Sequence, residues 1–347
     1  MSEQEKEKII NEPKKHHYIP QFILRNFYNQ DDQVLYWDIE KKTLSKRNTK
    51  KIFMNMNMYR DEVNNVENPT IIEKSFSVFE EEIAKLIREK FINKSVIEIT
   101  RGELEKLRIF LELLSFRSDS RMKQYKEKAF TSETREILKE YQPNEDYEDL
   151  WKKELLELTK CRCFKDIDDS KVIDPIIKVD FENSYKGYYM TILDARGGEF
   201  ILSDIYPTLE IFPLVDANIH LHAFYPISPT RAILLNHIMF KKEVKTAGTV
   251  MEYFINMSRI KGDLIRQPIP KYKKSPMEHT LDDLFPYKPA KIYESDLNYV
   301  NALILNEAKV GLMFRNAEKV NSSVKNFNLR DDTKVSYPEL EEALEKM

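Results

Sequence analysis

The sequence is poor in glycine and in cysteine, and each scarcity argues against particular classes of protein. Only 7 of the 347 residues are glycine, and neither a P-loop nor a GxGxxG pattern occurs. Functions that cradle phosphates in a glycine-rich loop are therefore disfavoured. The two cysteines, Cys161 and Cys163, are too close for an ordinary structural disulfide and supply at most half of a zinc site. We expect two free thiols in a reduced compartment.

Long hydrophobic runs and an excess of charge of one sign are also lacking. No segment approaches the roughly 18 apolar residues of a membrane-spanning helix, and residues 1–15 lack the apolar stretch of a secretory signal. The sequence therefore predicts a cytoplasmic protein with no membrane partner. The 55 basic and 58 acidic side chains nearly cancel, so any binding to nucleic acid would have to be local.

Helical periodicity dominates the first half of the chain. A short helix is expected after Pro20, and a hairpin from residues 34–40 and 43–54. Apolar residues at intervals of three and four predict helices that begin near Thr70 and near Thr100, where Glu103 completes a capping box. Two more helices are expected over 121–141 and 146–160.

The second half is richer in strand patterns. Strands are predicted at residues 174–182, 187–194, 199–203, 219–225 and 231–235, and helices at 247–260 and 294–316. The predicted class is α+β, a helical N-terminal half with a short hairpin packed on a C-terminal half that contains a mainly antiparallel sheet. We expect a flexible N-terminus over 1–15, one globular domain over 16–320 (helical part 16–163, sheet-containing part 164–320), and a polar C-terminal tail over 321–347.

The most distinctive segment is HHYIPQFILRNF at residues 16–27. Further patterns follow in order: IEK at 72–74 with Glu80, FRS at 116–118, FILSD at 200–204, PISP at 226–229, and Asn306 with Ala308. Together they resemble the bacterial domain of unknown function 4238 family over roughly residues 14 to 316. The resemblance implies a fold and a site, and it implies no reaction because the family has no settled activity.

His16 and His17 bring two imidazoles that titrate near neutral pH and can act as acid, base, metal ligand or phosphate partner. Adjacent side chains do not easily point the same way. We expect one histidine to face a site and the other, more readily His17, to pack against or cap the helix at Pro20. A structural role is the commoner one for such a pair.

Glu73 and Glu80 are two helical turns apart, so their carboxylates lie along one edge of a helix and could hold a divalent cation or orient a base. Solvation is favoured for Glu80, whereas Glu73 adjoins the apolar stripe and is expected to be partly buried. Arg117, at the margin of a leucine stripe, can fork onto a carboxylate such as Glu73 or donate to a phosphate.

Asp204 ends a predicted strand, where it either caps a loop through backbone N–H groups or serves as a catalytic carboxylate. His220 and His222 alternate on a predicted strand and could ligate a metal together. Because no third ligand is apparent, a surface feature is the expected role of this pair.

Two functions remain open from the sequence. The first is a metal-dependent hydrolase or nuclease that acts on nucleic acid or a nucleotide, in a setting such as bacterial defence. Its catalytic residues would be His16, His17, Glu73, Arg117 and Asp204, with a divalent metal ion on His17, Glu73 and Asp204. The second is a non-catalytic binding or regulatory module in which the same His/Glu/Arg network is structural.

Overall fold

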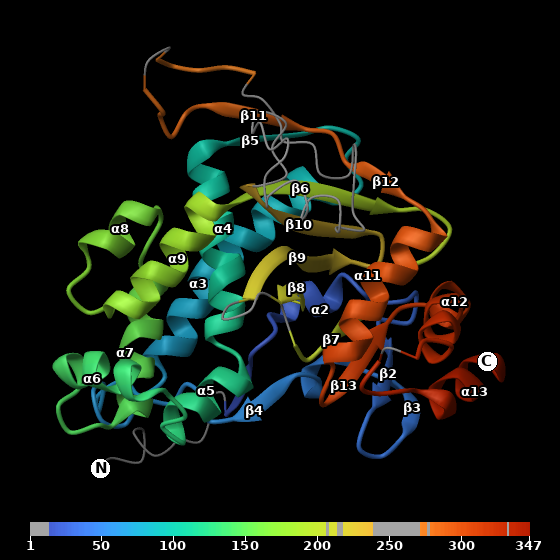
Figure 1. Ribbon diagram of the computed structural model, residues 1–347, viewed down its shortest axis with the longest axis horizontal. Coiled ribbons are helices and arrows are strands. Elements are labelled where there is room, and N and C mark those ends of the chain that lie inside the picture. Colours follow the sequence, from blue (N-terminus) through green and yellow to red (C-terminus); the bar gives the residue numbers. More distant parts are fainter. Residues whose placement is uncertain (1–13, 206–207, 214–217, 239–270, 276–277, 332) are drawn as a thin grey trace, which may run out of the picture.

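The computed structural model describes residues 14–205, 208–213, 218–238, 271–275, 278–331 and 333–347. The expected helix at 247–260 lies outside these residues. Helices α3 to α9 gather on one side of the molecule, a five-stranded sheet lies in the middle, and helices α11 to α13 lie on the other side (Figure 1). The α+β class is confirmed. No helix in the described residues is long and apolar enough to cross a membrane.

The N-terminal helices begin where local signals predict. Thr100 caps α4 and forms a complete capping box with Glu103, and Asp146 caps α7. The helix expected over 121–141 is instead two helices, because Thr131 accepts a hydrogen bond from the backbone of Thr134 and starts a new one. The helices of this part are α2 (Gln21–Arg25), α3 (Ile71–Leu86), α4 (Arg101–Phe116), α5 (Asp119–Lys126), α6 (Ser132–Tyr141), α7 (Tyr147–Leu158) and α8 (Phe164–Asp169), with a 3-10 turn η1 (Thr49–Lys51) and a π-helical turn η2 (Ile87–Phe91).

Residues 174–182, expected to be a strand, belong instead to helix α9 (Pro175–Gly187). Asp174 accepts hydrogen bonds from the N–H groups of Ile176 and Ile177 at 2.7 and 3.0 Å. Pro175 occupies the first turn, where its missing N–H costs nothing. The strand prediction was wrong because Asp174 and Pro175 form a helix start ahead of the apolar residues.

The central sheet has five strands in the order β12-β6-β10-β9-β8. All its pairings are antiparallel except β12 with β6. The strands expected at 187–194, 219–225 and 231–235 are confirmed within it. Its members are β6 (Tyr188–Ala195), β8 (Thr208–Pro213), β9 (Asn218–Ser228), β10 (Arg231–His237) and β12 (Ala290–Ile292).

A four-stranded sheet, in the order β3-β2-β13-β7, combines strands from the N-terminal and C-terminal parts of the chain. The predicted hairpin forms its strands β2 (Val34–Asp38) and β3 (Thr43–Arg47), and β2 pairs with β13 (Gly311–Phe314). The strand expected at 199–203 is reduced to β7 (Leu202–Ser203), which pairs with β13 on its other edge. The N-terminal part is therefore not purely helical, because its hairpin completes a C-terminal sheet.

Two further two-stranded sheets fix connecting segments. Strand β1 (Lys15–His17) pairs with β4 (Met54–Met56), and β5 (Ile97–Thr100) pairs with β11 (Leu284–Tyr287). Residues 1–13 of the expected flexible N-terminus lie outside the described residues, and Lys15 is already in a strand. The β1–β4 pairing holds His16 and His17 against the helical part.

The C-terminal segment differs from the expected polar tail. The helix predicted over 294–316 ends early, as α11 (Glu294–Glu307), and is followed by β13. Beyond it lie α12 (Ala317–Asn328) and α13 (Pro338–Glu345). Val320, Val324 and Phe327 are buried at helical spacing, and the many charged residues between them hid this stripe.

Candidate functional site

Arg117 ends helix α4, and its side chain is only 2% exposed. Its Nε donates to the hydroxyl of Tyr59 at 3.3 Å, and its Nη2 donates to the main-chain oxygen of His17 at 2.6 Å. Its Nη1 forms an ion pair with Glu80. The guanidinium carbon lies 3.9 Å from the ring centre of Phe76, a cation–π distance. Each guanidinium nitrogen is thus bonded within the chain.

The carboxylate that pairs with Arg117 is Glu80, for which solvation was expected. Glu73, the expected partner, forms no hydrogen bond or ion pair with the arginine, and its Oε2 atom is buried without a hydrogen-bond partner in the described residues. Burial raises the pKa of Glu73 to about 7, the charge of Arg117 opposes that rise, and the charge of Glu80 adds to it. The two glutamates therefore share one edge of α3, but only Glu80 is paired with Arg117.

The two histidines occupy different environments. His16 is fully buried, and its Nδ1 accepts a hydrogen bond of 2.8 Å from the backbone N–H of Tyr59, whose ring stacks on the imidazole. His17 contacts the side-chain amide of Gln21 through Nε2. Burial lowers the pKa of His17 to about 4, and Arg117 contributes to the lowering. His17 does not cap α2, because Pro20 is the N-cap residue and no side-chain cap bond is present.

Asp204 follows strand β7 and fixes a different loop. Its Oδ1 accepts hydrogen bonds from the N–H groups of Lys309, Val310 and Gly311 at 3.0, 2.8 and 3.1 Å. Burial raises the pKa of Asp204, and these three bonds oppose the rise. The carboxylate therefore ties the end of β7 to the segment that leads from α11 into β13.

Asp204 also lines a pocket of about 250 Å³ between that segment and the start of α5. We name it the Tyr18–Asp204 pocket; its polar lining includes Tyr18, Ser118, Asp119, Lys123, Asp204 and Lys309. Asp119 receives a hydrogen bond from Asn55 and an ion pair of 2.7 Å from Lys123. The pocket carries both signs of charge and a phenol.

Side chains from the separate sequence patterns meet in this pocket. Tyr18 belongs to the pattern at 16–27, Ser118 to the pattern at 116–118, and Asp204 to the pattern at 200–204. Lys309 directly follows Ala308. Hence the patterns converge on a pocket, although the histidines and Arg117 do not line it.

The predicted metal ligands are not brought together. In the residues that the structure describes, no three or more His, Cys, Asp or Glu side chains are grouped so that they could hold a metal ion. His17, Glu73 and Asp204 are accordingly not one ligand set in this arrangement. His16, His17, Glu80 and Arg117 form one connected group, Glu73 borders it, and Asp204 belongs to the neighbouring pocket.

Comparison with known proteins places the chain in a family. A family model described as "Protein of unknown function (DUF4238)" matches residues 15–318. The chain belongs to the DUF4238 family. No curated protein and no solved structure matches it. The patterns from His16 to Ala308 all lie within the residues matched to DUF4238.

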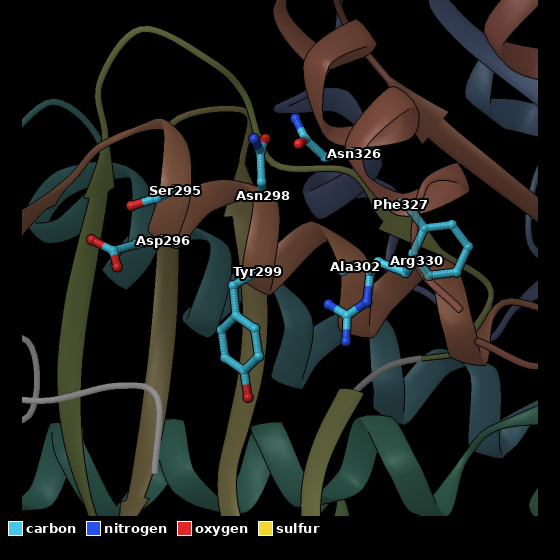
Figure 2. Close-up of a pocket in the computed structure, with 8 residues that line it drawn as sticks. All are labelled: Ser295, Asp296, Asn298, Tyr299, Ala302, Asn326, Phe327 and Arg330. Carbon is cyan, nitrogen blue, oxygen red and sulfur yellow. The ribbon is translucent and has the colours of Figure 1, made fainter. Parts of the chain in front are cut away.

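A larger pocket of this DUF4238 protein, about 380 Å³, lies between α11 and α12. Figure 2 shows Tyr299 of α11 and Arg330, just beyond α12, projecting from this region. None of the residues that the sequence singled out lines it. Asn298 of α11 accepts a hydrogen bond of 2.7 Å from Ser323 of α12, which joins the two helices, whereas Asn326 donates to the backbone of Ser322 at 2.8 Å within α12.

The expected surface role of the histidine pair on β9 is wrong for His222. This side chain is fully buried, with its Nδ1 3.0 Å from the side-chain oxygen of Asn236, and the Nδ2 of Asn236 donates to the hydroxyl of Thr191 at 2.9 Å. Burial lowers the pKa of His222 to about 4. The side chain of His220 lies outside the described residues.

The sequence singled out neither Tyr18 nor Asp119 as a site residue. Tyr18 stands directly beside the two histidines, and its phenol ordinarily stays neutral near pH 7, unlike their imidazoles. Asp119 directly follows the pattern at 116–118. A signal was therefore present in the patterns themselves, but only the fold shows that these side chains share a pocket with Asp204.

Proposed function

We propose that this DUF4238 protein is a binding module in which the Arg117 network is structural and the Tyr18–Asp204 pocket takes the ligand. The observation that carries the proposal is the saturation of Arg117: its three guanidinium nitrogens bond to Tyr59, Glu80 and the backbone of His17. A substrate phosphate would have to displace these partners from a side chain that is almost inaccessible.

The network also explains how the pocket is built. The bond from Arg117 to the carbonyl of His17 holds strand β1 on the end of α4. The next residue along each segment, Tyr18 and Ser118, lines the pocket. A buried and fully bonded polar network can fix one arrangement of a core without catalysing a reaction. Arg117 therefore affects the pocket indirectly, by positioning the segments that carry Tyr18 and Ser118.

Two variants test this proposal. Arg117→Met removes the guanidinium, and we expect the free energy of unfolding to fall by about 3 to 5 kcal/mol because Glu80 is left without its partner. His17→Ala keeps the main-chain carbonyl that Arg117 uses, so we expect a smaller loss. Unfolding is measured in denaturant, and hydrolysis of DNA, RNA and nucleotides is measured with Mg²⁺ and Mn²⁺.

The binding-module proposal expects no hydrolysis by the unaltered protein or by either variant. The opposite outcome is hydrolysis by the unaltered protein together with a folded, equally stable His17→Ala protein that has lost it. That pair of results would assign His17 to a catalytic centre and remove the proposal.

A metal-dependent hydrolase that acts on nucleic acid or a nucleotide, in bacterial defence, is the second candidate. The pKa of Glu73, raised to about 7, favours it, because a carboxyl that titrates near neutral pH suits a general acid or base. It would also need a divalent metal ion on His17, Glu73 and Asp204, which would require these side chains to move together. Its test is a hydrolysis rate that depends on pH around 7 and disappears in Glu73→Gln.

We also propose a cytoplasmic location. Cys161 and Cys163 are both free thiols, as expected in a reducing compartment. Burial raises the pKa of Cys161 to about 12, which keeps its thiol protonated and slow to oxidise. Fractionation of cells that express the tagged protein tests the location, and recovery in an extracytoplasmic fraction would contradict it.

A further inference from the structure

Tyr18 presents an unused hydroxyl to the pocket. The residue is only 5% exposed, its backbone N–H donates to the carbonyl of Phe53 at 3.1 Å, and its ring packs against the ring of Phe53. Within the described part of the chain, its hydroxyl makes no hydrogen bond, and the residue lines the pocket. Asp204 and Asp119 are the charges that act most strongly on it. The phenol is held rigidly, and its polar end is left for a ligand.

Asp204 presents an unpaired charge to the same pocket. The side chain is 9% exposed, and no lysine, arginine or histidine of the described residues forms an ion pair with it. Three backbone N–H groups reach Oδ1, whereas Oδ2 takes no hydrogen bond from another described residue. A buried carboxylate without a cation is costly, so a positively charged donor in the pocket would stabilise it.

The other charged residues of the pocket are either paired or exposed to solvent. Asp119 has Lys123 at 2.7 Å and Asn55 as partners. Lys309 is an exposed residue at the rim, and its backbone N–H serves Asp204. Among the buried residues of the lining, the charge without an ion-pair partner is therefore the negative one at Asp204, and an anionic ligand such as a phosphate would meet it unfavourably there.

The volume limits the size of the ligand. At about 250 Å³, the pocket is smaller than the roughly 300 to 1,000 Å³ of drug-sized ligand sites. It suits a molecule of a few heavy atoms and is too small to enclose a nucleotide.

We propose that the Tyr18–Asp204 pocket binds a small organic ligand through a primary ammonium group, which donates to Asp204 and to the oxygen of the Tyr18 hydroxyl. The inference rests on the proposed binding function, because it names the ligand class for the same pocket. An ammonium group has three donors and a full positive charge, whereas a neutral alcohol would leave the charge of Asp204 uncompensated.

Isothermal titration of the full chain with three probes of equal length tests the ligand class. Putrescine carries ammonium groups, butanediol is neutral, and succinate is anionic. We expect putrescine to bind and the other two not to bind. Measurement near physiological ionic strength screens attraction to exposed carboxylates.

Two variants place the binding. Asp204→Asn keeps an Oδ1 acceptor for the three backbone N–H groups and removes the charge. We expect the affinity for putrescine to fall by about tenfold or more. Tyr18→Phe removes only the hydroxyl, and we expect roughly a twofold to tenfold loss. Because that hydroxyl has no partner in the described chain, Tyr18→Phe is expected to fold normally. If Asp204→Asn does not fold, the putrescine affinity of Tyr18→Phe alone tests whether the ligand binds in this pocket.

The matched control is Asp296→Asn, the same chemical change in the pocket between α11 and α12, which should leave putrescine binding unchanged. The inference is overturned if none of the probes binds, if butanediol or succinate binds as well as putrescine, or if the folded pocket variants bind putrescine unchanged. Those results leave the structural role of Arg117 standing, whereas hydrolysis lost in a stable His17→Ala protein removes the proposed function itself.

Discussion

The Nη2 of Arg117 lies 2.6 Å from the main-chain oxygen of His17, across 100 residues of sequence. The bond joins the end of α4 to strand β1, and it uses the backbone of His17, not the imidazole. The imidazole points instead to Gln21. A residue that looks catalytic in the sequence thus contributes a carbonyl to the fold, and the arginine that looks like a phosphate ligand is the donor.

Glu73 should make stability depend on pH. Its folded pKa of about 7 lies above the ordinary 4.5, so the folded protein holds a proton that the unfolded chain releases as pH rises. The free energy of unfolding should therefore fall between pH 4.5 and 7, by up to about 3 kcal/mol. Glu73→Gln, an uncharged mimic of the protonated acid, should remove this fall. Denaturant unfolding across that range measures both proteins.

The exposed neighbour Glu81 gives the control for this measurement. Glu81→Gln should leave the pH dependence as in the unaltered protein, because its carboxylate is solvated in both states. If Glu73→Gln and Glu81→Gln gave the same curve, the burial of the Glu73 carboxyl would not be the cause.

Gly311 should not tolerate a side chain. A Cβ at this position would overlap the ring of Tyr36, which is buried in the adjacent strand. We expect Gly311→Ala to lower the free energy of unfolding by about 1 to 3 kcal/mol, as overpacking of a core does. It should also disturb the loop that Asp204 holds, since Gly311 supplies one of the three N–H donors.

Gly187 is the matched control, because a Cβ there meets no atom within 4 Å. Gly187→Ala, in the last turn of α9, should change the free energy of unfolding by less than about 1 kcal/mol, in the stabilising direction. Thermal unfolding of the two variants side by side gives the comparison. Equal effects would mean that the contact with Tyr36 does not limit position 311.

The helical C-terminal segment can be tested with two neighbouring residues. Phe327 of α12 is buried and its ring packs against the ring of Tyr337, whereas Leu329 is 75% exposed. Phe327→Ala should cost about 3 to 5 kcal/mol of unfolding free energy, and Leu329→Ala should cost less than about 0.5 kcal/mol. Similar small losses at both positions would instead restore the polar tail expected from the sequence.

Elements with a local start signal were predictable from the sequence. The capping box of Thr100 and Glu103 is chemistry within one turn of chain, and helix α4 begins there as expected. Helices α9, α12 and α13 were missed although their signals were present. In α9 the Asp174 cap competed with a strand-like apolar pattern, and in α12 the charged residues obscured a narrow apolar stripe.

The partners within the site were not predictable, because they depend on how helices pack. Glu73 and Glu80 lie on the same edge of α3, and the sequence offers no reason for Arg117 to choose one of them. The placement of α4 beside α3 brings Glu80 to the guanidinium and leaves the Glu73 carboxyl buried. The meeting of Tyr18 with Asp204 likewise depends on tertiary structure, because Tyr18 follows β1 and Asp204 follows β7, which belong to different sheets.

A double-mutant cycle between Arg117 and Glu80 tests the structural role of the network most directly. The free energy of unfolding is measured for the unaltered protein, Arg117→Met, Glu80→Gln and the double variant. We expect a coupling energy of at least about 1 kcal/mol, because the buried guanidinium of Arg117 and the half-buried carboxylate of Glu80 form an ion pair. A coupling near zero, with both single variants as stable as the unaltered protein, would contradict a network that holds the fold.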